Sequence, residues 1–148
     1  QRRGVQRAEV TLHVGIDTFR PIKMKKIDEH AMHSEWCAIP KETVAAIRRT
    51  QKLNQRVVAV GTTAVRSLET AAQSGAAESF VGATDLFIRP GYSFRTVDCM
   101  LTNFHMPKTT LMVLVSAFAG HELIRHAYQE AVRNGYRFLS YGDAMLIL

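Results

Sequence analysis

Residues 56–75 read RVVAVGTTAVRSLETAAQSG, and this stretch carries the clearest signal of the fold class. The apolar run 57–60 stops at Gly61, as a buried strand does before a tight turn. Apolar side chains then recur on one face of a helical pattern that closes at Gly75. They are Val65, Leu68 and Ala72. The stretch therefore predicts a strand, a turn and a helix in direct succession.

Similar patterns predict helices and strands along the rest of the chain. The predicted helices run from Pro40 to about Asn54, from Pro107 through the apolar residues 111–119, and from 123 to Asn134. The predicted strands are 8–14, 84–88, 92–97, 136–140 and 144–148, with 84–88 and 92–97 as an antiparallel pair. Helices interleaved with strands predict an α/β fold, a layered domain with a mixed β-sheet flanked by helices. The length suits a single domain, 1–148.

The chain carries 19 Lys and Arg against 13 Asp and Glu, a net charge of +6. This balance favours a polyanionic partner, nucleic acid first, and a well-solvated basic surface is the alternative. Cys37 and Cys99 lie far apart and form no C-x-x-C pair, so we expect neither a zinc knuckle nor a disulfide framework. A reducing cytoplasm fits that cysteine usage. The apolar residues 111–119 are too few to span a bilayer, so no membrane partner is expected.

The segment 101–111, LTNFHMPKTTL, is the first candidate for a functional loop. Asn103, His105 and Lys108 bring hydrogen-bond donors and an imidazole to the start of an apolar helix. Lys108 stands where the helix dipole disfavours a cation, so helix stability alone does not explain it. A histidine near neutral pKa and a lysine suit a proton shuttle and an anion clamp. A capped helix with an incidental histidine is the alternative.

Gly61, Thr62 and Thr63 form a second candidate, at the carboxyl end of a buried strand. Free backbone N–H groups, two hydroxyls and the helix dipole converge there, which suits a phosphate, a carboxylate or a ribose. A threonine N-cap behind a tight turn is the alternative. Arg66, one helical turn later, would support an anion, although arginines are also common on surfaces.

Three further histidines and a terminal turn complete the candidates. His30-x-x-His33 has a spacing that a helix can offer to a metal, but no third ligand stands at a diagnostic spacing, so we predict no metal. We interpret that segment as a polar strand entry or substrate loop. His13 alternates with apolar residues and is expected to point away from the core. Tyr141 and Asp143 place a phenol and a carboxylate before an apolar strand, and a plain turn is the alternative.

Taken together, these segments resemble one known family. The ordered motifs are LHVGIDTF (12–19), EHAMHSE (29–35), VGTTAVRSLE (60–69), TDLFIRPGYSF (84–94), LTNFHMPKTTL (101–111), VSAFAG (115–120) and YRFLSYGDAML (136–146). They resemble the carboxy-terminal part of the S-adenosylmethionine:tRNA ribosyltransferase-isomerases of the queuosine pathway. The resemblance covers nearly the whole chain. It implies an α/β domain beside a separate six-stranded β-barrel that is mostly or wholly absent here, and the start at Gln1 also suggests a fragment of a longer polypeptide.

The resemblance implies a reaction as well. Such enzymes take S-adenosylmethionine as a ribosyl donor and no metal. They transfer and isomerise the ribose onto 7-aminomethyl-7-deazaguanine at the wobble position of the tRNA anticodon. The products are epoxyqueuosine tRNA, adenine and methionine. The expected partners are therefore tRNA and the remaining part of the polypeptide.

That chemistry needs a base beside the sulfonium, a donor for the leaving adenine and cations for tRNA phosphates. His105 is the first candidate base, with His13 or His33 next. Contacts to the ligand and to tRNA are assigned to the remaining candidates. The amino-acid or adenine part of the cosubstrate would be contacted by Asp143 or Glu35. The cosubstrate would also be bound by Gly61, Thr62, Thr63 and Asn103. Phosphate, carboxylate or tRNA would be held by Lys108, Arg66 and Tyr141.

The chain departs from the family pattern at Asp17, where relatives usually have glycine. If that position needs a positive φ, Asp is among the better-tolerated replacements. Thr109 replaces the usual serine and keeps the hydroxyl. Two other classes of function remain open, a non-catalytic basic RNA-binding module and a generic α/β nucleotide-binding domain centred on Gly61–Thr63.

Overall fold

The structure is a computed structural model that describes residues 3–19, 21–22, 27 and 31–148. His30 of the predicted metal spacing lies outside the described residues. The elements in chain order are β1 (Thr11–Leu12), the 3-10 helix η1 (Ile16–Phe19), β2 (Glu35–Ile39), α1 (Lys41–Lys52), β3 (Val58–Val60), α2 (Thr62–Ala71), β4 (Phe80–Thr84), β5 (Cys99–Asn103), α3 (Thr110–Ala119), α4 (His121–Arg133) and β6 (Ala144–Ile147).

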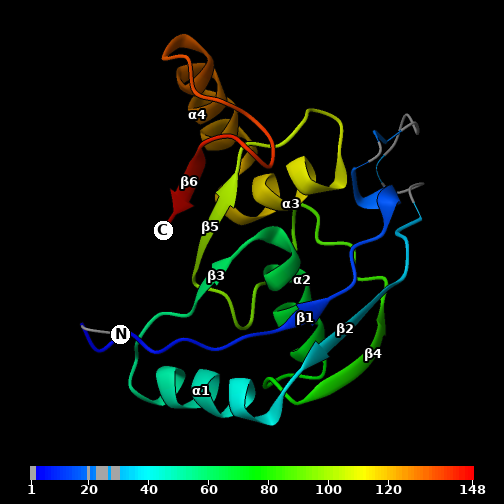
Figure 1. The fold of residues 1–148 in the computed structure, drawn as a ribbon, viewed down its shortest axis with the longest axis vertical. Helices are drawn as coiled ribbons and strands as arrows, with labels where there is room; N and C mark the ends of the chain where they lie inside the picture. The colour runs from blue at the N-terminus through cyan, green and yellow to red at the C-terminus, as the bar shows by residue number, and fades with distance from the viewer. Residues whose placement is uncertain (1–2, 20, 23–26, 28–30) are drawn as a thin grey trace.

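The described strands form two sheets of three strands each (Figure 1). The first has the order β1-β2-β4 and is antiparallel throughout. The second has the order β3-β5-β6, with β3 parallel to β5 and β6 antiparallel to it. The α/β class is therefore confirmed, but mixed pairing is confined to the second sheet.

Helix α2 lies between the two sheets and contacts strands of both (Figure 1). Its predicted apolar face is confirmed, because Val65, Leu68 and the capping residue Ala72 are all buried. The helix ends at Ala71 and not near Gly75. Polar residues on its other faces are buried as well, since a helix between two sheets has little contact with solvent. They are Thr62, Arg66, Ser67, Glu69 and Thr70.

The predicted antiparallel pair 84–88 and 92–97 is wrong. The strand in this region is β4, which starts earlier and pairs with β2 from Phe80 to Thr84. Residues 92–97 are instead tied to the buried carboxylate of Glu69. It accepts hydrogen bonds from the Tyr92 hydroxyl (3.1 Å) and from the backbone N–H groups of Arg95 (2.9 Å), Thr96 (3.0 Å) and Val97 (3.0 Å). A side chain therefore supplies the acceptors that a partner strand would have supplied.

Other predicted bounds also change. The first strand is limited to Thr11–Leu12, and Val14 is 45% exposed. Residues 136–140 form no strand. The Arg137 N–H donates to the Asp143 carboxylate, and the Leu139 N–H donates to the Phe104 carbonyl. The predicted strand 144–148 is confirmed as β6. Strand β2 and strand β5 were not predicted as strands.

The helices are closer to their predictions. Helix α1 begins directly after Pro40, and α4 ends at Arg133 before the turn at Asn134 and Gly135. Helix α3 begins at Thr110 with Thr109 as its N-cap, whose hydroxyl accepts the Met112 N–H at 3.3 Å. Placing Pro107 in the first helical turn was therefore wrong.

Candidate active site

Parallel pairing brings two of the predicted candidates to one edge of the second sheet. Val60, the last residue of β3, pairs with Leu101, two residues before the end of β5, and the Gly61 N–H donates to the Leu101 carbonyl at 2.8 Å. The turn Gly61–Thr63 consequently lies beside Thr102 and Asn103. The carboxyl ends of parallel strands are the usual place for ligands in α/β sheets.

The turn itself leaves the start of α2 open. Gly61 has φ 91°, a left-handed conformation that glycine adopts without strain, and no side chain caps the helix. The alternative of a threonine N-cap is therefore wrong. Thr62 is buried and Thr63 is half-buried. Free N–H groups of a first helical turn attract anions and ligand oxygens.

Strand β6 adds the terminal turn to the same edge, because Ala144 pairs with Asn103. The Asn103 side chain donates to the Asp143 carbonyl at 3.2 Å. The Asp143 carboxylate accepts the Arg137 N–H at 2.7 Å and lies 3.8 Å from the Arg137 guanidinium. This carboxylate closes the turn, as the plain-turn alternative predicts. Tyr141, at the tip of the turn, is 98% exposed.

His105 follows β5 and is buried. Its Nε2 lies 3.0 Å from the Thr102 hydroxyl, and its backbone N–H donates to the Tyr128 hydroxyl at 2.8 Å. Burial lowers the pKa of His105 to about 4, because a charged imidazolium loses hydration there. The imidazole is therefore neutral at neutral pH.

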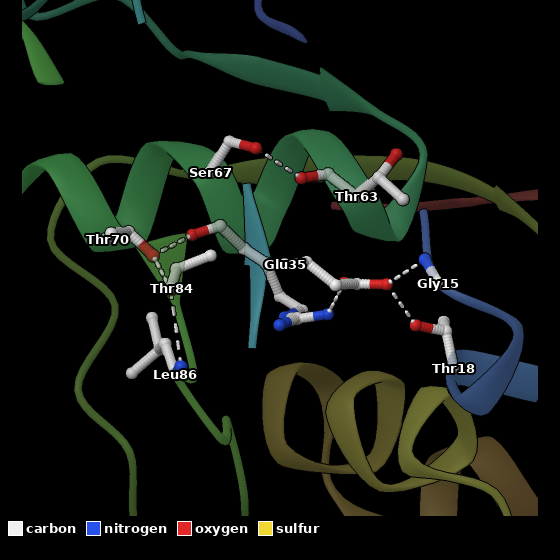
Figure 2. Close-up of polar contacts among 9 residues, drawn as sticks. Gly15, Thr18, Glu35, Thr63, Ser67, Thr70, Thr84 and Leu86 are labelled. Carbon is white, nitrogen blue, oxygen red and sulfur yellow. Dashed lines mark hydrogen bonds and ion pairs between the residues drawn. The ribbon is translucent and has the colours of Figure 1, made fainter. Parts of the chain in front are cut away.

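A second centre lies between α2 and the first sheet. Glu35, at the start of β2, accepts hydrogen bonds through one carboxylate oxygen from the Gly15 N–H and the Thr18 hydroxyl, both at 2.6 Å (Figure 2). Its other oxygen pairs with Nη1 of Arg66. The side chains of Arg66 and Glu35 are 3% and 1% exposed, so the alternative of a surface arginine is wrong.

Threonines continue the polar contacts along α2. The Thr70 hydroxyl donates to the Arg66 carbonyl at 2.8 Å and lies 2.7 Å from the Thr84 hydroxyl, which accepts the Leu86 N–H at 3.2 Å (Figure 2). These contacts connect α2 to the end of β4. The sequence analysis predicted neither these threonine contacts nor the role of Glu69. The number of polar residues on every face of α2 could have indicated them.

The remaining candidates lie on the surface. The His13 ring packs on Trp36 with centroids 4.7 Å apart and is exposed, as predicted. His33 is also exposed. Lys108 is exposed, has φ 59°, and accepts the Ile22 N–H at its carbonyl (2.7 Å). It precedes the N-cap of α3, so the predicted conflict with the first helical turn does not arise.

Asp17 lies within η1, whose right-handed backbone needs no positive φ. Within the described part of the chain, no three His, Cys, Asp or Glu residues gather as a metal site. Cys37 and Cys99 are both buried free thiols. None of the described helices has the length and apolar character to cross a membrane.

Comparison with known families gives a match over nearly the whole chain. Residues 1–147 match the family described as queuosine biosynthesis protein. The chain is 55% identical over 148 residues to the S-adenosylmethionine:tRNA ribosyltransferase-isomerase of Thermotoga maritima, covering 100% of this chain and 44% of that protein. It is 58% identical over 145 residues to the protein of that name from Cupriavidus pinatubonensis, covering 97% of this chain and 42% of the relative.

The fold has a counterpart among solved structures. It matches a crystal structure of S-adenosylmethionine tRNA ribosyltransferase from Thermotoga maritima with a TM-score of 0.82 at 50% sequence identity. The match covers 99% of this chain and 46% of that one. The chain thus spans less than half the length of the relatives it matches, and the rest of their length has no counterpart here.

Proposed function

Because the chain belongs to the family of queuosine biosynthesis proteins, we propose that the protein carrying it is a tRNA ribosyltransferase-isomerase. The match over residues 1–147 is the observation that carries the proposal. The reaction transfers and isomerises the ribosyl group of S-adenosylmethionine onto 7-aminomethyl-7-deazaguanine at the tRNA wobble position. Epoxyqueuosine, adenine and methionine are its products. It takes place in the cytoplasm and needs no metal.

In this proposal the chain acts as one α/β domain and contributes the sheet edge at Gly61–Thr63 to the cosubstrate site. The open N–H groups at the start of α2 support it, because they suit a ribose oxygen or a carboxylate. Asn103 lies beside that turn through the pairing of β3 with β5. The rest of the polypeptide completes the site.

His105 is the first candidate for the base that removes a proton next to the sulfonium. Its neutral imidazole has an acceptor available at neutral pH. A base works best when its pKa is near the working pH, and burial holds the pKa of His105 at about 4, below that range. Exposed His13 and His33 are the next candidates. Asp143 would assist by closing the turn that holds Asn103 in place.

Exposed residues of the turn before β6 and of the loop before α3 supply the proposed contacts to tRNA. The phenol ring of Tyr141 is free to stack on an unpaired base of the anticodon loop. The exposed ammonium of Lys108 would bind phosphate. The net charge of +6 favours such a partner.

The test uses the full-length protein, S-adenosylmethionine and tRNA that carries the aminomethyl-deazaguanine, with mass spectrometry of the digested nucleosides. Epoxyqueuosine in the digest supports the proposal. We expect His105→Ala to abolish it and His126→Ala, an exposed histidine of α4, to retain it. Near wild-type turnover of His105→Ala would exclude His105 as the base.

The same material separates the alternatives. A plain RNA-binding module would bind tRNA with a strong salt dependence and leave its nucleosides unchanged. A generic nucleotide binder would bind S-adenosylmethionine with the same affinity in the presence and in the absence of tRNA.

A further inference from the structure

The guanidinium of Arg66 is only partly used by the protein. An arginine offers five N–H donors. Glu35 takes a donor of Nη1, whereas Nε and Nη2 of Arg66 are buried and have no hydrogen-bond partner. Buried donors without acceptors destabilise a fold, so native structures pair nearly all of them. A fully buried side chain with an open set of donors therefore calls for an acceptor from outside the described chain.

The two unpaired atoms form one edge of the guanidinium. Nε and Nη2 direct parallel N–H bonds to the same side, a geometry that matches the two oxygens of a carboxylate. In two other arginines of the described chain, Arg48 and Arg125, this edge is filled. Nε and Nη2 of Arg48 donate to the Ala77 carbonyl at 3.2 and 2.8 Å. Those of Arg125 donate to one Glu122 oxygen at 3.2 and 2.6 Å.

Glu35 fixes which edge stays open. Its oxygens are occupied by the Gly15 N–H, the Thr18 hydroxyl and Nη1 of Arg66. The carboxylate is thereby held from two sides and cannot turn to the Nε edge without breaking these contacts. Glu35 is thus a positioning residue for Arg66 and not a group that meets the ligand.

We propose that the Nε and Nη2 edge of Arg66 binds the carboxylate of an amino-acid ligand. Under the proposed function, on which this identification rests, the ligand is the methionyl part of S-adenosylmethionine. The Arg66–Glu35 pair is already neutral, so a bound carboxylate adds a negative charge. The positively charged ammonium and sulfonium groups of such a ligand offset that negative charge. An inorganic phosphate carries no positive group that could do so.

Burial also selects the ligand. The Arg66 side chain is 3% exposed, which excludes the phosphate backbone of a folded RNA. Binding of a small molecule at this edge requires the atoms that cover it to move apart. Arg66 therefore binds the cosubstrate, and exposed residues make the tRNA contacts.

The test compares S-adenosylmethionine with its decarboxylated analogue by calorimetry on the full-length protein. The wild type is expected to bind the carboxylated ligand about 10- to 100-fold more tightly, as charge-assisted hydrogen bonds require. Arg66→Lys keeps a cation for Glu35 and loses the two-pronged edge, so it should bind both ligands within about threefold of each other. Arg48→Lys removes the same edge from an internal contact and should keep the wild-type preference.

Two results would overturn the inference, equal affinities in the wild type or a preference that survives in Arg66→Lys. If Arg66→Lys does not fold, a crystal structure of the wild type with S-adenosylmethionine decides. A carboxylate oxygen within about 3 Å of Nε and Nη2 supports the inference, and a carboxylate bound elsewhere contradicts it.

Failure of the proposed function has a separate signature. A wild type that binds neither S-adenosylmethionine nor the analogue contradicts the proposed cosubstrate. The Arg66 site is then tested with L-methionine and inorganic phosphate in a thermal shift assay. A shift with methionine that Arg66→Lys abolishes supports a carboxylate site, while no shift, or a shift with phosphate alone, overturns it.

Discussion

Arg66 of α2 and Glu35 of β2 form an ion pair in which both side chains are almost fully buried. They lie 31 positions apart along the chain. The pair joins the central helix to the first sheet, and the hydrogen bonds of Glu35 extend the connection to Gly15 and Thr18. It therefore couples the stability of the fold to the placement of a candidate ligand contact.

Replacing Glu35 should destabilise the protein strongly. Glu35→Ala leaves the Arg66 charge buried without its partner, which costs about 3–5 kcal/mol of the free energy of unfolding. Urea denaturation measures the change. Glu122→Ala, which removes an exposed partner of Arg125, is the matched control and should change stability little. Equal stability of the two variants would contradict a structural role for the buried pair.

Removing Glu69 should free the segment 92–97. Glu69→Ala deletes the acceptor of four hydrogen bonds. Hydrogen exchange of the Arg95, Thr96 and Val97 amides is expected to accelerate, and stability to fall by about 3 kcal/mol or more because the loss includes buried donors. Glu78→Ala, at an exposed position, is the control. Unchanged exchange at these amides would show that Glu69 does not hold the segment.

Stability should depend on pH through His105. Its folded pKa of about 4 lies below the ordinary value of 6.5, so the unfolded chain binds more protons between these values. Stability is then complete above about pH 6.5 and falls by about 3 kcal/mol as pH drops through 4. Denaturation of the wild type and of His105→Gln at pH 7 and pH 4 isolates the contribution of His105 to the free energy of unfolding. The loss on acidification should be smaller in His105→Gln, and an identical loss would refute the assignment.

The terminal turn should not tolerate a side chain at Gly142. A Cβ there would lie 2.4 Å from the Arg137 carbonyl oxygen and 2.6 Å from the Phe138 carbonyl carbon, both backbone atoms. Gly142→Ala is expected to cost at least about 1–3 kcal/mol, since the backbone must shift. At Gly82 the three atoms nearest to a Cβ all belong to the Phe80 ring, the first at 3.3 Å, and that side chain can move. Thermal denaturation should therefore rank Gly142→Ala well below Gly82→Ala, and the reverse order would contradict the geometry of the turn.

Elements with a strong local pattern were predictable. Strand β3 and helix α2 follow from the run 57–60 and the helical spacing after Gly61, because burial on one face leaves a periodic signal. Helices α1 and α4 carry the same signal. Strand β2 was missed since its inward residues include the charged Glu35. The segment 92–97 reads as a strand, but a distant carboxylate decides its conformation.

The site was predictable in its parts and not in its arrangement. Gly61–Thr63, Asn103 and Asp143 stood out individually as polar residues beside apolar elements. Their gathering depends on the parallel pairing of β3 with β5, a contact between distant segments that no local pattern encodes. The pairing of Arg66 with Glu35 depends in the same way on two elements that meet only in the folded chain.

Release of adenine from S-adenosylmethionine by the full-length protein is the decisive measurement for the proposed activity. We predict that adenine and methionine appear in equal amounts only when tRNA carrying the aminomethyl-deazaguanine is present. Absence of adenine with that tRNA, or formation of S-adenosylhomocysteine by methyl transfer, would contradict it.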